Sequence, residues 1–95
     1  MAPYEFDYDL ARRFGRNLFM ARRRAGLSQE ELASAASLHR TEIGLLERGG
    51  RIARIDTLIK LASALELPPG DLLDGMDWVP APAASPGRFV SRGPG

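Results

Sequence analysis

Apolar residues recur at intervals of three and four positions between residues 10 and 65, and this spacing constrains the fold more than any other feature of the chain. Such a spacing places side chains on one face of a helix. The first stripe consists of Leu10, Phe14, Leu18, Ala21 and Ala25, and Gly26 follows it as a helix stop. No stretch before residue 76 alternates like a core strand. The pattern predicts an all-α fold that begins with a helix over about residues 9–25.

The sequence also marks the boundaries of four further helices. Ser28 and Glu31 have the spacing of a capping box, which predicts a second helix over residues 29–36. A third follows over residues 40–48 and is ended by two glycines. After a loop over residues 49–54, a fourth helix has Asp56 as a candidate cap, and Pro69 can occupy the first turn of a fifth, short helix. We expect a compact five-helix unit.

Length and composition limit what surrounds this unit. With 95 residues there is room for one domain, and a unit of about sixty residues buries only about 60% of its unfolded surface, so close helix packing or a second subunit must stabilise it. The absence of cysteine excludes a disulfide framework and a thiolate zinc site, and we expect no metal or other cofactor. Because neither a signal pattern nor a membrane-length apolar run is visible, we expect a cytoplasmic protein that does not contact a membrane.

The residues after Gly75 differ in composition from the rest of the chain. They are rich in Pro and Gly, which predicts an extended tail rather than a packed element. Trp78, Phe89 and Val90 are its only large apolar anchors. We therefore divide the chain into an N-terminal arm over residues 1–8, a helical domain over 9–75 and a Pro/Gly-rich tail over 76–95.

Charge is unevenly distributed, although the net charge is only +1. Residues 1–9 carry −3, residues 10–60 carry +6 and residues 61–77 carry −4. A basic middle segment is compatible with a polyanionic partner, and a solvated charged surface is the alternative.

The second and third helices have the spacing of a helix-turn-helix. With Gln29 as its first residue, the motif has Ala33 fifth, Ile43 fifteenth and Leu46 eighteenth, which supplies a small residue at the helix crossing and two apolar residues that hold the second helix. Together with the stretches over 26–33, 43–49 and 58–62, this pattern resembles the Cro and phage-repressor (XRE) family over residues 12–74. The resemblance implies a five-helix DNA-binding domain that docks as a two-fold dimer on a palindromic operator.

Three residues depart from the family pattern. Ser37 occupies the ninth motif position, where the turn needs a positive φ and Gly is common, at a cost of about 1 kcal/mol. His39 stands where Ser or Thr often caps the third helix, and Gly44 stands where Ser is frequent. A glycine inside a helix costs about 0.5 to 1 kcal/mol relative to Ala, which a close approach to its bare backbone could offset.

The N-terminal part of the third helix is expected to enter the major groove and to read bases there. Arg40 can bind guanine O6 and N7 with two hydrogen bonds, and Thr41 offers a hydroxyl and a methyl group. Leu45 can touch a thymine methyl group, or it can pack on the fourth helix or at a subunit contact. Glu42 can accept from a cytosine amino group, or it can cap the helix.

Other residues are expected to bind phosphates or to hold the helices together. Gln29 begins the second helix, where free amides and the helix dipole favour an anion. The remaining phosphate candidates are Ser28, His39, Arg23, Arg24, Arg51 and Arg54. The family resemblance further implies a partly buried ion pair between Arg22 and Glu47, which joins the first helix to the end of the third.

These residues favour a sequence-specific DNA-binding transcriptional regulator, with repression as its expected mode. Its expected partners are double-stranded DNA and a second copy, held through the aromatic residues Tyr4, Phe6 and Tyr8 or through Phe89 and Val90 as an added strand. The alternative is an antitoxin-like or adaptor protein whose tail binds a protein partner. An enzyme is poorly supported, because the chain has one His, no Cys and no Gly-rich phosphate loop.

Overall fold

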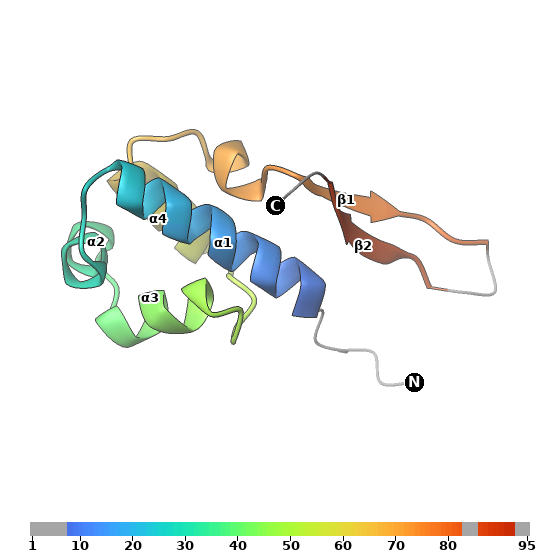
Figure 1. Cartoon of the computed structure of the whole chain (residues 1–95), viewed down its shortest axis with the longest axis horizontal. Coiled ribbons are helices and arrows are strands. Elements are labelled where there is room, and N and C mark those ends of the chain that lie inside the picture. Colours follow the sequence, from blue (N-terminus) through green and yellow to red (C-terminus); the bar gives the residue numbers. More distant parts are fainter. Residues whose placement is uncertain (1–7, 83–85, 93–95) are drawn as a thin grey trace.

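The computed structural model describes residues 8–82 and 86–92, and it is mostly helical with a small antiparallel sheet (Figure 1). In chain order the elements are α1 (Tyr8–Arg24), α2 (Gln29–Ala36), α3 (Arg40–Glu47), α4 (Ile55–Ala64), the 3₁₀ helix η1 (Pro69–Leu73), β1 (Met76–Val79) and β2 (Arg88–Ser91). The four α-helices lie where the apolar spacing predicts them. Their observed ends differ from the predicted ends by at most one or two residues. Within the described residues, none of these helices is long and apolar enough to span a membrane.

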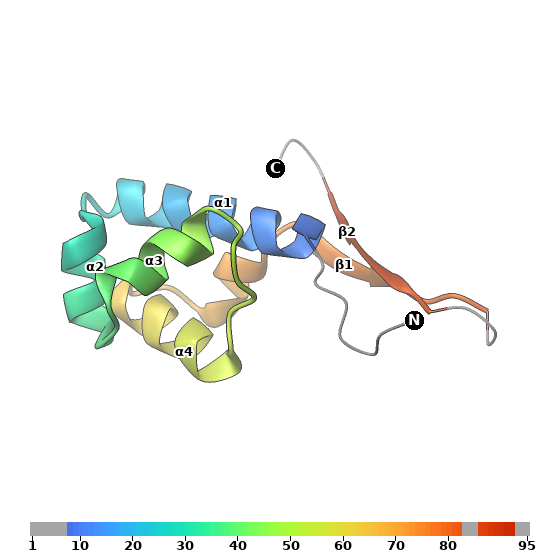
Figure 2. The same ribbon diagram turned by 90° about the horizontal axis from the view of Figure 1, so that it is seen from below.

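The core lies between the helices and is built from the predicted apolar stripes. α1 runs along the length of the helical part, and α3 lies directly beneath it (Figure 2). α2 packs against α3 and α4, and η1 packs against α1 and α4. Large side chains with less than 2% of their surface exposed come from every helix, namely Leu18, Leu32, Ile43, Leu46, Leu61 and Leu72. Each such burial contributes about 1.5 to 3 kcal/mol, so this cluster is the main source of stability.

Gly15 allows α1 and α3 to pack backbone against backbone. A Cβ added at this position would lie 2.6 Å from the carbonyl oxygen of Glu47 and even closer to that of Leu46. No side chain larger than hydrogen fits there without moving one helix. The spacing of apolar residues does not reveal this role, because a glycine in a helix is normally only a weak point.

The turn between α2 and α3 has the left-handed conformation expected for it. Ser37 has φ 57° and ψ 44°, and the amide of Leu38 donates to the carbonyl of Ala33 at 2.9 Å. The prediction of a positive φ at Ser37 is therefore confirmed. The strain, about 1 kcal/mol, is maintained by the packing of both helices.

The helix starts agree with the sequence at α2 but not at α4. The capping box is present, since Ser28 Oγ accepts from the Glu31 amide at 3.0 Å and the Ser28 amide donates to Glu31 Oε1 at 2.8 Å. The assignment of Asp56 as the cap of α4 is wrong, because α4 begins at Ile55 and Arg54 is its N-cap residue. Asp56 instead accepts from the amide of Thr57. The fifth helix is a 3₁₀ helix of five residues, η1.

The prediction of an unpacked, extended tail is wrong, and so is a strictly all-α fold. β1 and β2 form an antiparallel hairpin in which Trp78 pairs with Phe89, with ring centroids 5.0 Å apart in an edge-to-face arrangement. α1 anchors the start of the hairpin, because Arg13 Nε and Asn17 Nδ2 donate to the carbonyl of Asp74 at 3.1 and 2.8 Å. The strands have four residues each, and Pro80, Pro82 and Pro86 lie between them.

Candidate nucleic-acid interface

α3 presents an exposed N-terminal end on the surface of the helical part. Arg40 and Thr41 are exposed, as is His39, the N-cap residue, whose side chain makes no capping hydrogen bond. Ile43 and Leu46 are fully buried on the opposite face and fix the helix to the core. The arrangement therefore holds one face rigidly and leaves the other open to a large partner.

Two of the predicted base readers are engaged in weak ion pairs. Arg40 Nε lies 3.7 Å from Glu30 Oε1, with both side chains more than 60% exposed. Glu42 Oε2 lies 3.8 Å from Nη1 of Arg51, a predicted phosphate residue. In the second pair, the Glu42 side chain is 25% exposed and that of Arg51 is 51% exposed. Long ion pairs that reach the surface contribute at most about 1 kcal/mol, so a stronger partner can replace them.

Leu45 is compatible with both of its predicted roles, packing within the protein and contact with a base. It is half-buried, and a Cβ added at Gly50 would lie 3.3 Å from Leu45 Cδ2. Its side chain therefore rests against the loop that follows α3. This contact agrees with the packing alternative and still leaves part of the leucine exposed.

A buried hydrogen-bond network fixes α3 to α1 and α2. Arg22 Nε and Nη2 donate to the two carboxylate oxygens of Glu47 at 2.6 and 3.0 Å, and the two side chains are only 8% and 6% exposed. Arg22 Nη1 also donates to the carbonyl of Leu27 at 2.8 Å. The hydrogen bond to Glu47 raises the pKa of Arg22 above its usual value, even though burial opposes this. The structure thus brings together the two residues of the implied ion pair.

Gln29 joins the same network, a contact that sequence reasoning missed. Its Nε2 donates to Glu47 Oε1 at 3.0 Å, so the carboxylate of Glu47 receives three hydrogen bonds. Gln29 was predicted to bind phosphate, and part of its amide is instead used inside the protein. The spacing of 18 residues between them gives no local signal, because only the fold brings these side chains together.

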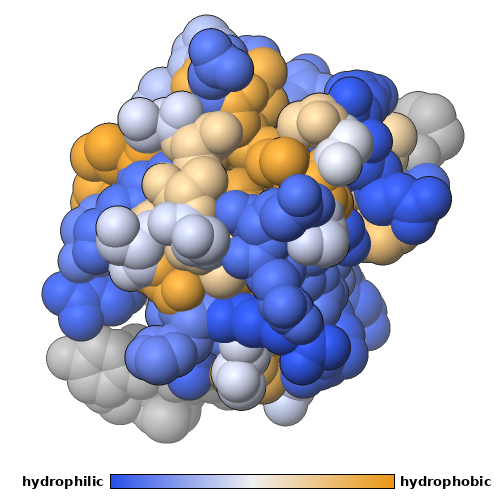
Figure 3. Space-filling model, turned by 90° about the vertical axis from the view of Figure 1, so that its left-hand side faces the viewer, coloured by the Kyte–Doolittle hydropathy of each residue, from blue (hydrophilic) through white to orange (hydrophobic). Residues whose placement is uncertain are grey.

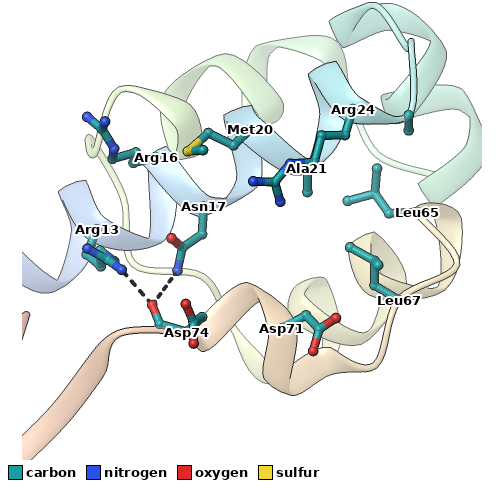
Figure 4. Close-up of a pocket in the computed structure, with 11 residues that line it drawn as sticks. Arg13, Arg16, Asn17, Met20, Ala21, Arg24, Leu65, Leu67, Asp71 and Asp74 are labelled. Atoms are coloured by element: carbon teal, nitrogen blue, oxygen red, sulfur yellow. Dashed lines mark hydrogen bonds between the residues drawn. The ribbon is translucent and has the colours of Figure 1, made fainter. Parts of the chain in front are cut away.

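The other phosphate candidates are not gathered at one place. Ser28 bonds Glu31, and Arg54 Nε lies 3.3 Å from Asp56 Oδ1. The guanidinium of Arg23 stacks over the Phe19 ring at 5.6 Å. Arg24 lines a cavity of about 560 Å³ between α1 and the segment around η1, together with Leu65, Leu67 and Asp71 (Figure 4). Its side chain extends back along α1 (Figure 4).

The end of the molecule where α2 lies is largely polar. Hydrophilic residues cover much of this surface, with apolar patches between them (Figure 3). At the start of α2, hydrogen bonds from the Ser28 backbone and side chain lower the pKa of the Glu31 carboxyl group. Among residues 8–82 and 86–92, no three His, Asp or Glu side chains cluster as metal ligands.

Two short helices, a left-handed turn and a second helix exposed on one face define a helix-turn-helix protein. The sequence pattern of the helix-turn-helix family matches residues 18–72. The chain belongs to this family, in its Cro and phage-repressor (XRE) branch. The matched residues cover α2, α3, α4 and nearly all of η1, and the hairpin lies outside them.

Relatives of the chain include control proteins of bacteria. It is 45% identical to control protein C.BamHI of Bacillus amyloliquefaciens over 51 residues, which are 54% of this chain and 63% of that protein. It is 56% identical to control protein C.SmaI of Serratia marcescens over 39 residues, 41% of this chain and 46% of that one. The chain thus matches about half to two thirds of the length of these relatives.

Solved structures share the helical fold. The restriction-modification controller protein C.AhdI of Aeromonas hydrophila is 40% identical and superposes with a TM-score of 0.64, over 65% of this chain and 94% of that one. A hypothetical transcription factor from Neisseria, NHTF, is 32% identical with a TM-score of 0.66, over 77% of this chain and 86% of that one. The matched family and these relatives are regulators rather than enzymes.

Proposed function

We propose that this chain is a sequence-specific DNA-binding transcriptional regulator that reads operator DNA through α3. The exposed Arg40 and Thr41 carry the proposal, because they stand on a helix that the Arg22 and Glu47 pair fixes to the core. In the major groove, Arg40 binds guanine O6 and N7, and Thr41 contacts a neighbouring base. Arg51, Arg54 and the amides at the start of α2 supply phosphate contacts, which set register and salt dependence.

The regulated genes are proposed from the relatives. C.AhdI is named a restriction-modification controller protein. By this likeness, we propose that the chain controls genes of a restriction-modification system and represses at least one promoter. DNA binding through α3 is compatible with repression, since a protein bound across a promoter blocks access to it.

We propose a two-fold dimer as the binding form, because a palindromic operator needs two reading helices. An apolar groove of about 230 Å³ near the start of α4 supports it, with Leu10, Phe14, Ile52, Ile55, Leu58 and Leu73 among its lining residues. Ile55 is 76% exposed and Ile59 is 53% exposed. Among the contacts suggested from the sequence, Tyr4 and Phe6 lie outside the described residues, whereas Tyr8 is 65% exposed.

The test is a footprint of the purified protein on DNA upstream of its own gene, followed by operator variants with single base-pair changes. Arg40→Ala should weaken cognate binding about 5- to 150-fold and relax selectivity at one base-pair position, with unchanged helicity. Arg88→Ala, which removes an exposed arginine from β2, is the matched control and should leave selectivity unchanged. Absence of a salt-dependent footprint would refute the function, and an equal loss on every sequence would assign Arg40 to phosphate.

A second candidate function is the binding of a protein partner through the hairpin. Trp78 and Phe89 support it, because they are 52% and 38% exposed and form an aromatic pair outside the family match. Exposed aromatic residues are frequent anchors of protein interfaces. In this case Trp78→Ser would preserve the footprint and abolish the effect on transcription, whereas a loss of both would contradict a separate role for the hairpin.

A further inference from the structure

Arg48 lies at the end of α3 on the same exposed stripe as Thr41. The two residues are seven positions apart, which places them within about 20° of each other around the helix. Arg48 is exposed, and no acidic side chain lies within 4 Å of its guanidinium among residues 8–82 and 86–92. It is therefore a cation directed to the side of α3 that carries the predicted base readers.

Gly44 determines where the head of Arg48 lies. A Cβ added at Gly44 would be 3.0 Å from Arg48 Nη1 and 3.8 Å from its Cζ. The guanidinium therefore folds back by one helical turn and covers the bare backbone at Gly44, as the N-terminal tilt of helical side chains favours. A Cβ at Gly44 would also lie 3.9 Å from Gln29 Oε1, so the head group approaches the start of α2.

This geometry explains why a glycine occupies position 44 inside a helix. A glycine there weakens the helix, and no backbone from another element is among its three nearest neighbours, unlike at Gly15. What occupies the space is the far end of Arg48. The bare position thus brings a cation from the end of α3 back toward its middle, where the reading face meets the groove.

We propose that Arg48 is a further specificity-determining residue, which reads a guanine through its O6 and N7 atoms, and that Gly44 holds its guanidinium in reach of that base. The inference rests on the proposed function, since it deepens how the same helix reads DNA. A phosphate contact is the competing role for an arginine at a helix end. The two roles differ in outcome, because a base contact changes selectivity and a phosphate contact does not.

The experiment is a double-mutant cycle on the full chain with Gly44→Ala, Arg48→Ala and the combined variant, measured on the footprinted operator and on its single base-pair variants. Arg48→Ala should lose about 5- to 150-fold in affinity and become indifferent to one base-pair position. Gly44→Ala should raise Tm by a few degrees, as alanine favours the helix, and yet weaken operator binding. In the Arg48→Ala background, Gly44→Ala should still raise Tm but no longer affect binding.

Because Gly44→Ala should raise Tm and yet weaken operator binding, its effect on base recognition can be told apart from an effect on folding. In Arg48→Ala, an equal loss of affinity on all operator variants would assign Arg48 to a phosphate contact and overturn the inference, if the slope of log affinity against log salt concentration also fell by about one. If Gly44→Ala weakened operator binding equally with and without Arg48, the inference would be overturned as well. These results leave the wild-type footprint intact, whereas a wild type without any footprint would refute the proposed function itself, and the inference with it. Arg88→Ala again serves as the control for loss of one exposed positive charge.

Discussion

Replacement of Glu47 by alanine is expected to unfold much of the protein before it affects any contact with DNA. Glu47 receives hydrogen bonds from Arg22 Nε, Arg22 Nη2 and Gln29 Nε2, at 2.6, 3.0 and 3.0 Å. The Arg22 side chain is 8% exposed. In Glu47→Ala, this guanidinium would remain buried with the Leu27 carbonyl as its one hydrogen-bond acceptor in the described structure.

The expected loss is large relative to the stability of so small a domain. Removal of one partner from a buried ion pair costs about 3 to 5 kcal/mol, because a charge remains without compensation. At about 0.05 to 0.15 kcal/mol per residue, the described part of the chain has a free energy of unfolding of about 4 to 12 kcal/mol. For a domain of this size the loss lowers Tm by between about 12 and 40 °C.

Urea and thermal unfolding followed by circular dichroism measure this effect. Glu30→Ala is the matched control, because Glu30 lies 3.7 Å from Arg40 and is 78% exposed, and it should change the free energy of unfolding by less than about 1 kcal/mol. The loss of free energy of unfolding in Glu47→Gln should lie between those of Glu47→Ala and Glu30→Ala, since glutamine keeps a hydrogen-bond acceptor but removes the charge. If Glu47→Ala lowered the free energy of unfolding no more than Glu30→Ala, the buried Arg22 charge would not depend on Glu47 for its compensation.

Three further predictions concern the scaffold. Gly15→Ala should lower the free energy of unfolding by about 1 to 3 kcal/mol or more in urea titrations, because its Cβ would meet the Glu47 carbonyl at 2.6 Å; Gly70→Ala, where no atom lies within 4 Å, is the control and should have little effect. Ser37→Gly should raise Tm by a few degrees, because the left-handed turn costs Ser about 1 kcal/mol, and a lower Tm would contradict the strain. The lowered pKa of Glu31 stabilises the fold at pH values above 4.5, its pKa in the unfolded chain, and this contribution is lost as the pH falls through the pKa in the folded protein. The free energy of unfolding of Glu31→Gln should therefore fall less steeply with acid than that of the wild type. An unchanged slope of this free energy against pH would count against the capping box.

Local patterns in the sequence were sufficient for the helical part. The spacing of apolar residues, the capping box at Ser28 and the helix stops at Gly26 and Gly49 act within a few residues of each other, so they can be read along the chain. The positive φ at Ser37 followed from its position in the motif. The family resemblance implied the pair of Arg22 and Glu47, which the structure joins at 2.6 Å.

Other features depended on contacts between residues far apart in the chain. The hairpin forms because residues 76–79 and 88–91 meet across a long connection and are anchored by α1, and composition favoured an extended tail there. Gln29 donates to Glu47, and Gly15 is bare because α3 crosses it. Likewise, the helix wheel places Arg48 on the reading face, but only the folded chain brings its head over Gly44. Sequence by itself determined the elements that short-range backbone bonds and apolar spacing create, and tertiary structure decided the close approaches, since these depend on how finished helices pack.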